Sequence, residues 1–210
     1  MKITSATFIT SVGEFKKLPE ETLPEIAFVG RSNVGKSSLL NSLTGTRIAK
    51  TSSTPGKTRL INFFAINSAN AQFYFVDLPG YGFAVGDKGE RAAWERTVGG
   101  YVSQRSTLHG VIILLDSRHF ILPNDEEAVL WIESLSKPYI IALTKADKLK
   151  QSERSKTARE AERYFSGRPL CRGCIMHSSQ TTTGKKEIMQ AIEILLGEYH
   201  GANIEDEHII

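Results

Sequence analysis

The sequence contains few cysteines and no long apolar segment, and both shortages limit what the chain can be. Only two of its 210 residues are cysteine, too few for a disulfide framework. The longest unbroken apolar run, Val111 to Leu115, is far shorter than a membrane-spanning helix. The first four residues contain nothing like the apolar core of a signal peptide. We therefore expect a cytoplasmic protein with no membrane span, and we also expect a monomer.

The two cysteines have the C-x-x-C spacing of some metal and redox sites. Cys171 and Cys174 are followed by His177, but a tetrahedral zinc site needs four ligands and there is no second cysteine pair. A thioredoxin-like pair would stand at a helix N-terminus after a strand, whereas this pair precedes a predicted strand. The spacing alone therefore does not indicate a metal or redox function.

Apolar runs and helical periodicity alternate along the chain. Runs typical of strands lie at 26–29, 60–66, 73–76, 111–115, 139–143 and around 175–176. Helical patterns cover 36–43, 152–165 and 185–196, and Asn124 or Asp125 would cap a further helix. The turn-like residues 67–70 predict a hairpin. This order predicts an α/β, three-layer fold, mostly parallel with one antiparallel hairpin strand.

The same pattern predicts the domain organisation and the place of the site. We expect a single domain over residues 1–197 and an acidic, disordered tail over 198–210, which has four acidic residues and no Lys or Arg. In open α/β sheets ligands bind at the carboxyl ends of the strands. The loops that follow the predicted strands should therefore carry the chemistry.

The first such loop is a P-loop. The pattern G-x-x-x-x-G-K-[ST] stands between a predicted strand and a predicted helix, which is the context that it requires. Its backbone amides would face phosphate oxygens, Lys36 would reach the β- and γ-phosphates, and Ser37 would bind Mg²⁺. The predicted cradle consists of Gly30, Arg31, Ser32, Asn33, Val34, Gly35, Lys36, Ser37 and Ser38.

Two further loops complete a guanine-nucleotide pattern. Asp77 opens the sequence D-x-x-G, which places its carboxylate near the metal, through water, and the amide of Gly80 near the γ-phosphate. Thr144, Lys145 and Asp147 form the guanine loop. Asp147 would accept two hydrogen bonds from guanine, a pair that adenine lacks. Thr144 stands where asparagine is usual, and we expect its hydroxyl to bridge loops.

Two weaker signals add to these loops. Ser178 and Ser179 follow the strand around 175–176, and their backbone amides would meet the guanine carbonyl. Residues 51–59 have the composition of a mobile switch loop. A threonine there would reach Mg²⁺ only when the γ-phosphate is present, and both Thr54 and Thr58 are candidates.

With these four motifs in order, the chain resembles the EngB family of bacterial GTPases over roughly residues 22–197. The most specific matches are residues 30–38, 51–58 and 77–84. The resemblance implies that Thr58 is the switch-loop metal ligand and that Gly56 and Lys57 belong to the nucleotide site. It also implies that Lys36, Thr58 and Gly80 are the catalytic residues.

The resemblance carries further expectations about cofactors and role. It implies that Asn33 helps to hold a potassium ion beside the phosphates, and that Tyr81 replaces the water-orienting glutamine of Ras-like enzymes, so that hydrolysis is slow. It also implies a GTP-dependent role in assembly of the large ribosomal subunit, with effects on cell division and septation. The nine Lys or Arg residues within 145–172 fit either contact with ribosomal RNA or a solvated helix face.

Two other functions compete with this one. A P-loop kinase or ATPase is disfavoured because the guanine loop selects against adenine and no part of the chain is left for a lid or substrate domain. An interaction protein of the division machinery, with no direct ribosomal role, is disfavoured because the sequence lacks coiled-coil heptads. Concentration-dependent sedimentation of the pure protein would favour the second of these.

Overall fold

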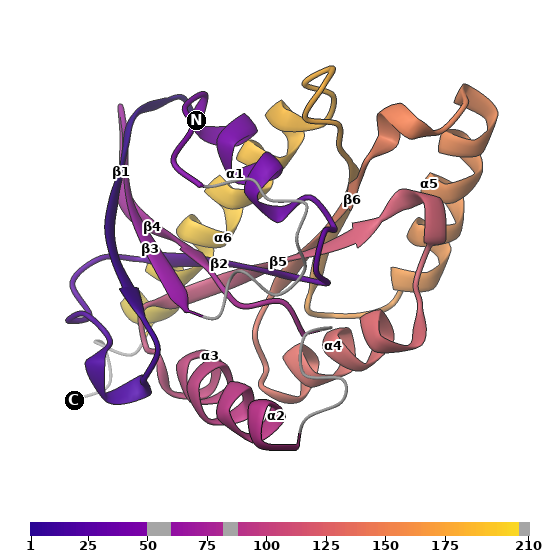
Figure 1. The fold of residues 1–210 in the computed structure, drawn as a ribbon. Helices are drawn as coiled ribbons and strands as arrows, with labels where there is room; N and C mark the ends of the chain where they lie inside the picture. The colour runs from indigo at the N-terminus through magenta and orange to yellow at the C-terminus, as the bar shows by residue number, and fades with distance from the viewer. Residues whose placement is uncertain (50–59, 82–87, 206–210) are drawn as a thin grey trace.

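The computed structural model describes residues 1–49, 60–81 and 88–205, in which strands and helices alternate (Figure 1). The strands are β1 (Ile3–Val12), β2 (Glu25–Gly30), β3 (Ile61–Ser68), β4 (Gln72–Asp77), β5 (Leu108–Asp116), β6 (Tyr139–Thr144) and β7 (Cys171–Met176). The helices are α1 (Lys36–Thr44), α2 (Lys88–Trp94), α3 (Gly100–Gln104), α4 (Pro123–Ser134), α5 (Gln151–Phe165) and α6 (Lys185–Glu205). A π-helical segment, Glu95–Gly99, joins α2 to α3.

The strands form one sheet in the order β1-β3-β4-β2-β5-β6-β7. β2 pairs in parallel with β4 and β5, and β6 pairs in parallel with β5 and β7. Among the seven strands that the structure describes, only β3 runs the other way, antiparallel to both β1 and β4. The predicted mostly parallel sheet with one antiparallel hairpin strand is therefore confirmed.

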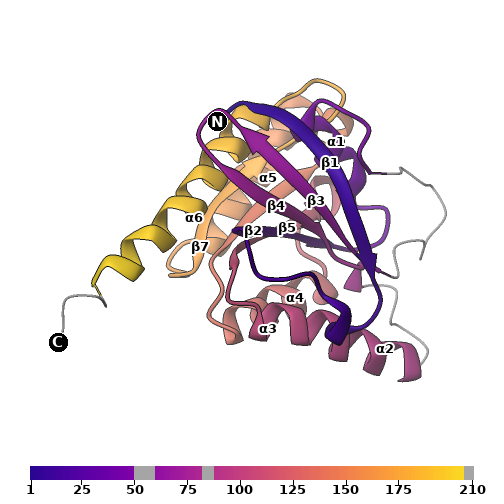
Figure 2. The same cartoon turned by 90° about the vertical axis from the view of Figure 1, so that its left-hand side faces the viewer.

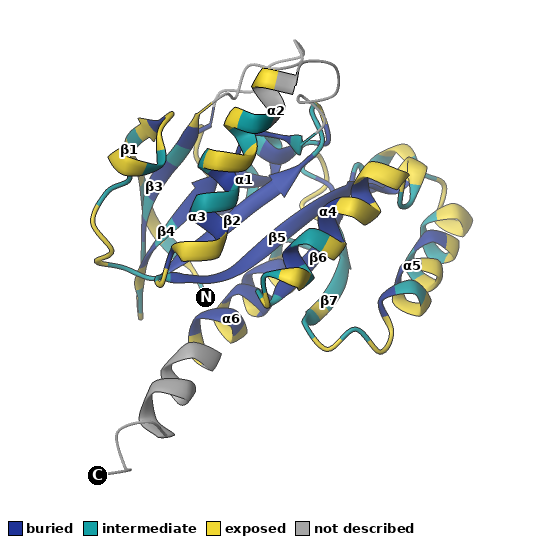
Figure 3. Cartoon of the chain, turned by 90° about the horizontal axis from the view of Figure 1, so that it is seen from below, coloured by how far each residue is buried: buried dark blue, intermediate teal, exposed yellow. Residues whose placement is uncertain are grey.

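Helices cover both faces of the sheet, as the turned view in Figure 2 shows. Alternate residues of a strand point to opposite faces. Ile26 and Phe28 of β2 pack with α1 and α6, whereas Ala27 and Val29 belong to the core beneath α3, α4 and α5. In Figure 3 the central strands are buried and the outer sides of α4 and α5 are exposed. β2, β5 and β6 are buried along their whole length, which explains their unbroken apolar runs.

The N-terminal strand was not predicted from the sequence. β1 is an edge strand that pairs only with β3, and most of its residues are exposed or half-buried. Phe8 and Ile9 are 52% and 46% exposed. Because one side of β1 packs little against the core, its sequence lacks the apolar run that marks the central strands.

Two helix ends differ from the prediction. α4 begins at Pro123, so Asp125 lies inside its first turn and caps the helix by accepting a hydrogen bond from the backbone N–H of Leu122 at 3.1 Å. Asn124 is not the cap. α6 continues to Glu205, through residues 198–205 that were expected to be disordered. Extending an established helix adds one hydrogen bond per residue, so the chain continues past the amphipathic part. The end of the predicted tail, residues 206–210, lies outside the described residues.

The four predicted nucleotide loops within the described residues each leave the sheet at the carboxyl end of a parallel strand, whereas the predicted switch loop, residues 51–59, lies outside the described residues. The loops follow β2, β4, β6 and β7, which bring together residues far apart in the sequence. Among the helices that the structure describes, none is long and apolar enough to cross a membrane.

Candidate functional site

The loop between β2 and α1 forms a tight turn that ends at the helix N-terminus. Gly35, the residue before α1, has a φ of +107°, where a side chain would be strained. Asn33 is also left-handed, with a φ of 61°. Unpaired backbone amides and the helix dipole make such a turn a site for anions. The turn therefore favours an anion at the start of α1, and the phosphate-binding role of Gly30 to Ser38 stays a prediction.

Lys36 and Asp77 meet where β4 ends beside α1. Their side chains form an ion pair and are only 9% and 4% exposed. The side-chain amide of Asn62, on the neighbouring strand β3, also donates to Asp77 Oδ2 at 3.4 Å. The predicted phosphate-binding cation and the predicted metal-site carboxylate therefore occupy one spot, although they lie on different elements.

The oxygen donors near Lys36 suit a magnesium ion. Magnesium prefers hard oxygen ligands and binds through one or two protein groups together with phosphates and water. The Ser37 hydroxyl and the Asp77 carboxylate are donors of this type. The other predicted residues of the switch loop, Thr54, Gly56, Lys57 and Thr58, lie outside the described residues. Within the described ranges, no cluster of three or more His, Cys, Asp or Glu side chains could hold a metal.

The loop after β4 packs directly on the P-loop. A Cβ atom added to Gly80 would lie 2.8 Å from the carbonyl oxygen of Gly30 and 3.2 Å from the amide nitrogen of Ser32. Backbone atoms cannot move aside as the end of a side chain can, so only glycine fits. The contact brings the two predicted phosphate loops together at Gly80.

Thr144 ties the guanine loop to the P-loop. Its hydroxyl lies 2.6 Å from the carbonyl oxygen of Val34 and 3.1 Å from that of Leu115, and the side chain is buried. The expectation that this hydroxyl bridges loops is confirmed. The replacement of asparagine at this position therefore leaves the loop-to-loop hydrogen bond in place.

Asp147 is oriented by the loop after β7. The Ser178 hydroxyl donates to Asp147 Oδ1 at 2.8 Å. Burial acts to raise the pKa of Asp147, but this hydrogen bond and the neighbouring Lys148 outweigh it, so the pKa lies below its usual value. Asp147 is therefore an ionised acceptor at neutral pH, as guanine recognition requires.

One expectation about the serines is corrected. The backbone amide of Ser178 donates to the carbonyl of Thr183 at 3.2 Å, so it is not directed to a guanine carbonyl. This bond closes the turn between β7 and α6. The Ser178 hydroxyl, which donates to Asp147, is the group that contacts the guanine loop. The predicted role of the Ser179 amide stays a prediction.

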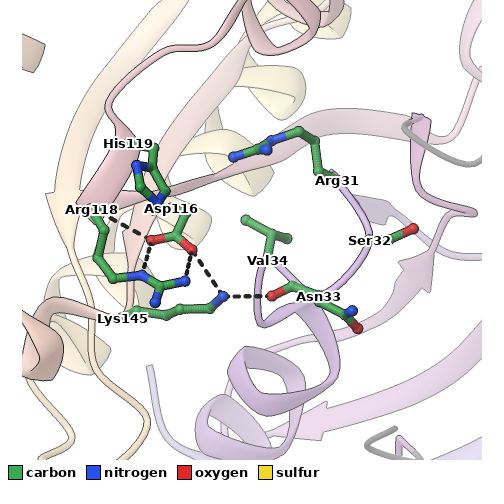
Figure 4. A pocket seen from close by; sticks show the side chains of 8 residues that line it. All are labelled: Arg31, Ser32, Asn33, Val34, Asp116, Arg118, His119 and Lys145. Atoms are coloured by element: carbon green, nitrogen blue, oxygen red, sulfur yellow. Dashed lines mark hydrogen bonds and ion pairs between the residues drawn. The ribbon is translucent and has the colours of Figure 1, made fainter. Parts of the chain in front are cut away.

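Asp116, at the end of β5, organises one wall of the site (Figure 4). Its carboxylate accepts from Arg118 at 2.7 and 2.9 Å and lies 2.9 Å from Lys145 Nζ. Burial acts to raise its pKa, but these cations hold the pKa well below its usual range. Lys145 also donates to the carbonyl oxygen of Asn33 at 2.6 Å. These residues line a pocket of about 210 Å³ beside the P-loop.

Sequence analysis missed several residues of this site. Asp116 had a usable signal, because it directly follows the buried run 111–115 at the carboxyl end of a strand. Asn62 and Arg118 belong to no motif. The side chain of Arg31 forms an ion pair with Asp125 of α4 at 2.9 Å, and the predicted place of its backbone in the phosphate cradle stays a prediction.

Comparison with known proteins agrees with this geometry. A family model described as "50S ribosome-binding GTPase" matches residues 25–145, more than half of the chain. A relative from Prosthecochloris aestuarii, named "Probable GTP-binding protein EngB", is 50% identical over 94% of this chain and 100% of its own length. A relative of the same name from Chlorobium luteolum is 48% identical over 96% of each chain. The chain belongs to the EngB family of GTPases.

Solved structures show the same architecture. A crystal structure of a probable GTP-binding protein engB aligns with a TM-score of 0.63 at 24% identity, over 83% of this chain and 99% of that one. Era, in complex with MgGDPNP and nucleotides of 16S ribosomal RNA, aligns with a TM-score of 0.67 at 26% identity, over 80% of this chain and 55% of that one. As an EngB-family GTPase, the protein binds GTP and GDP and hydrolyses GTP to GDP and phosphate.

Proposed function

We propose that this GTPase is a nucleotide-dependent switch that docks on the large ribosomal subunit during its assembly. The observation that carries the proposal is the match of residues 25–145 to the family described as 50S ribosome-binding GTPase. On this proposal the protein acts in the cytoplasm. Its loss would disturb cell division and septation indirectly, because fewer large ribosomal subunits would be assembled.

We further propose that Mg²⁺ accompanies the nucleotide. Ser37 and Thr58 would bind the ion directly and Asp77 through water, and Lys36 would neutralise the β- and γ-phosphates. When bound, the metal would supply charge neutralisation of the phosphates. Gly80 packs against the P-loop, and its backbone amide would stabilise the γ-phosphate there.

Slow hydrolysis follows from the residue after Gly80. The Tyr81 hydroxyl donates to Asp125 at 2.7 Å, so its proton is already committed to a hydrogen bond within the protein. We expect potassium, held near Asn33, or the ribosomal partner to accelerate the reaction. Single-turnover rates in matched sodium and potassium buffers, with and without large subunits, test this. Identical rates in all four conditions would contradict it.

We expect the basic residues within 145–172 to contribute less to RNA binding than their number suggests. Lys145 pairs with Asp116 and Arg168 pairs with Glu133, so these two cations are engaged within the protein. Along α5, Arg159 and Arg163 are exposed, but acidic side chains share the helix. We therefore expect docking to depend on the nucleotide-bound loops as well as on charge.

Co-sedimentation with purified large subunits tests the proposal. The protein is loaded with a non-hydrolysable GTP analogue or with GDP, and gel filtration checks that the loaded protein is a monomer. We expect binding in the GTP form and little in the GDP form. Small subunits serve as the control for general affinity for RNA, and competition of ATP against GTP checks guanine selection.

Binding in neither state, by folded and nucleotide-loaded protein, would overturn the ribosomal role. The alternative is then a GTP-binding interaction protein of the division site with no direct ribosomal role. Equal binding in both states would remove the switch but leave the ribosomal partner.

A further inference from the structure

We infer that Asp125 is a positioning residue for GTP hydrolysis, because it joins the P-loop to the residue after Gly80 from a helix outside both loops. Asp125 lies in the first turn of α4 and is fully buried. Arg31 Nε donates to its Oδ1 at 2.9 Å, and the Tyr81 hydroxyl donates to the same oxygen at 2.7 Å. The inference rests on the GTPase activity and is independent of ribosomal docking.

Because the Asp125 carboxylate is buried, a structure in which both donors stay hydrogen-bonded to it is strongly favoured. An ionised group without water must be paired and hydrogen-bonded, and the loss of one partner leaves it poorly compensated. Burial, followed by the charge of Asp125, raises the pKa of Tyr81 far above its usual value. The phenol therefore stays protonated and remains a donor. Movement of Tyr81 away from Asp125 is consequently unfavourable.

The side-chain network connects the same two backbone segments that meet at Gly80. Gly80 packs on Gly30 and Ser32, while its neighbour Tyr81 is linked through Asp125 to Arg31 of the P-loop. Both connections join residues 80–81 to residues 30–32 of the P-loop. Together they fix the distance between the loop after β4 and the phosphate cradle.

A second anchor holds the other side of Gly80. The indole N–H of Trp94 donates to the carbonyl oxygen of Pro79 at 3.1 Å. Trp94 also packs on Trp131 of α4, with ring centroids 5.3 Å apart. Gly80 thus lies between two anchored neighbours, and both anchors depend on α4. Its amide is held in place by side chains that lie outside the loop after β4.

Fixed placement of this amide would matter most in the transition state. Donors aimed at developing charge contribute little to ground-state binding and much to the rate, and small displacements reduce the rate strongly. Loss of Asp125 should therefore slow hydrolysis while leaving GDP affinity nearly unchanged. A merely structural role would lower stability and affect both nucleotides alike.

The test is Asp125→Asn in the full chain, with single-turnover GTP hydrolysis, GDP affinity and thermal unfolding measured together. Asparagine keeps an acceptor for the Leu122 amide but removes the charge that holds Arg31. We expect the rate at saturating GTP to fall at least about tenfold and GDP affinity to stay within about twofold. The matched control is Glu153→Gln, which removes the capping carboxylate of α5, where Glu153 accepts from the Lys150 amide at 2.7 Å.

Two results would overturn the inference. One is a folded Asp125→Asn protein that hydrolyses GTP at the wild-type rate. The other is a loss of GDP affinity by the same factor as the rate, which would show general damage to the site. A Glu153→Gln protein that loses as much rate as Asp125→Asn would count against it equally.

If Asp125→Asn does not fold, Tyr81→Phe tests the role of Asp125 instead. This variant removes one hydroxyl and keeps the Arg31–Asp125 ion pair. We expect a reduced rate with unchanged GDP affinity. Where both variants fold, the double variant should be no slower than the slower single one, since both act through the same contact. A wild-type rate for Tyr81→Phe, or fully additive losses in the double variant, would refute the role of Asp125.

Discussion

At the scale of single residues, the guanine loop depends on one buried hydroxyl. Thr144→Val keeps the shape of the side chain but removes the donor to Val34 and Leu115. Loss of a buried hydrogen bond that leaves carbonyls unpaired costs about 1–3 kcal/mol. We expect the free energy of unfolding to fall by about that amount and GDP affinity to fall with it. Chemical denaturation and nucleotide titration measure both, and Thr144→Ser, which keeps the hydroxyl, should remain close to wild type.

A second residue-scale feature concerns the two cysteines, Cys171 and Cys174 of β7. Residues three apart in a regular strand point to opposite faces, yet Cys171 and Cys174 pack against the same core. The register of β7 against β6 shifts between the partners Tyr139 and Ile141, and this irregularity turns both thiols to one side. Tertiary pairing therefore brings the two thiols together.

This pairing predicts a pH-dependent reactivity. The hydrogen bond from Cys174 lowers the pKa of Cys171 to about 7 despite partial burial. Thiolate forms above the pKa, so alkylation of Cys171 should rise as the pH passes through 7, while Cys174, whose pKa is raised, stays unreactive. Peptide mass spectrometry after iodoacetamide treatment measures this. In Cys174→Ala the rise should move toward the ordinary thiol pKa of about 8.5, and an unchanged profile would contradict the pairing.

At the scale of elements, a buried ion pair fixes the start of β2. Glu25 is fully buried and accepts from Arg105 at 2.7 and 2.9 Å and from the Tyr101 hydroxyl at 2.7 Å. Burial and then Glu25 raise the pKa of Tyr101, so its phenol stays a donor. The cluster lies at the amino end of β2, opposite the nucleotide loops, and its role is structural.

Arg105→Met should therefore destabilise the protein without changing its chemistry. Removing one partner of a buried pair costs about 3–5 kcal/mol, because the remaining charge is uncompensated. We expect a lower midpoint of urea unfolding, while the GTPase rate per folded molecule stays unchanged. The double variant with Glu25→Gln should recover much of the loss. A single variant as stable as wild type would show that Glu25 is not held by Arg105.

Element by element, the sequence predicted the central strands well and the edges poorly. β2, β5 and β6 are buried throughout, so their apolar runs identify them. β1 is half-exposed and depends on pairing with β3, which no local pattern encodes. The capping role of Asp125 differs from the prediction because Pro123 opens α4, and proline is favoured at the first helical position.

At the scale of the whole molecule, one buried histidine makes stability depend on pH. His177 is 1% exposed, and its Nε2 has no hydrogen-bond partner within the described residues. Burial lowers its pKa to about 4. Between that value and the unfolded pKa of about 6.5, the unfolded chain binds the additional proton. Stability is therefore retained above pH 6.5 and declines as the pH falls toward 4.

The expected slope is at most about 1.4 kcal/mol per pH unit, since a single proton is involved. Urea unfolding at pH 7, 6 and 5 measures it. His177→Gln should lose this component even if its stability at pH 7 is lower. A slope over this range that is the same in wild type and variant would show that other groups cause the pH dependence.

By itself the sequence determined the nucleotide loops and their order, because phosphate and guanine binding require particular residues at fixed local spacings. From these, the fold class and the GTPase family follow. Tertiary structure alone decided how the loops are held. The links from Asp125 to Arg31 and Tyr81 join residues up to 94 positions apart. Asp116 likewise reaches Lys145 only because β5 and β6 lie side by side. Such contacts depend on how strands and helices pack, and a local pattern of residues does not record that.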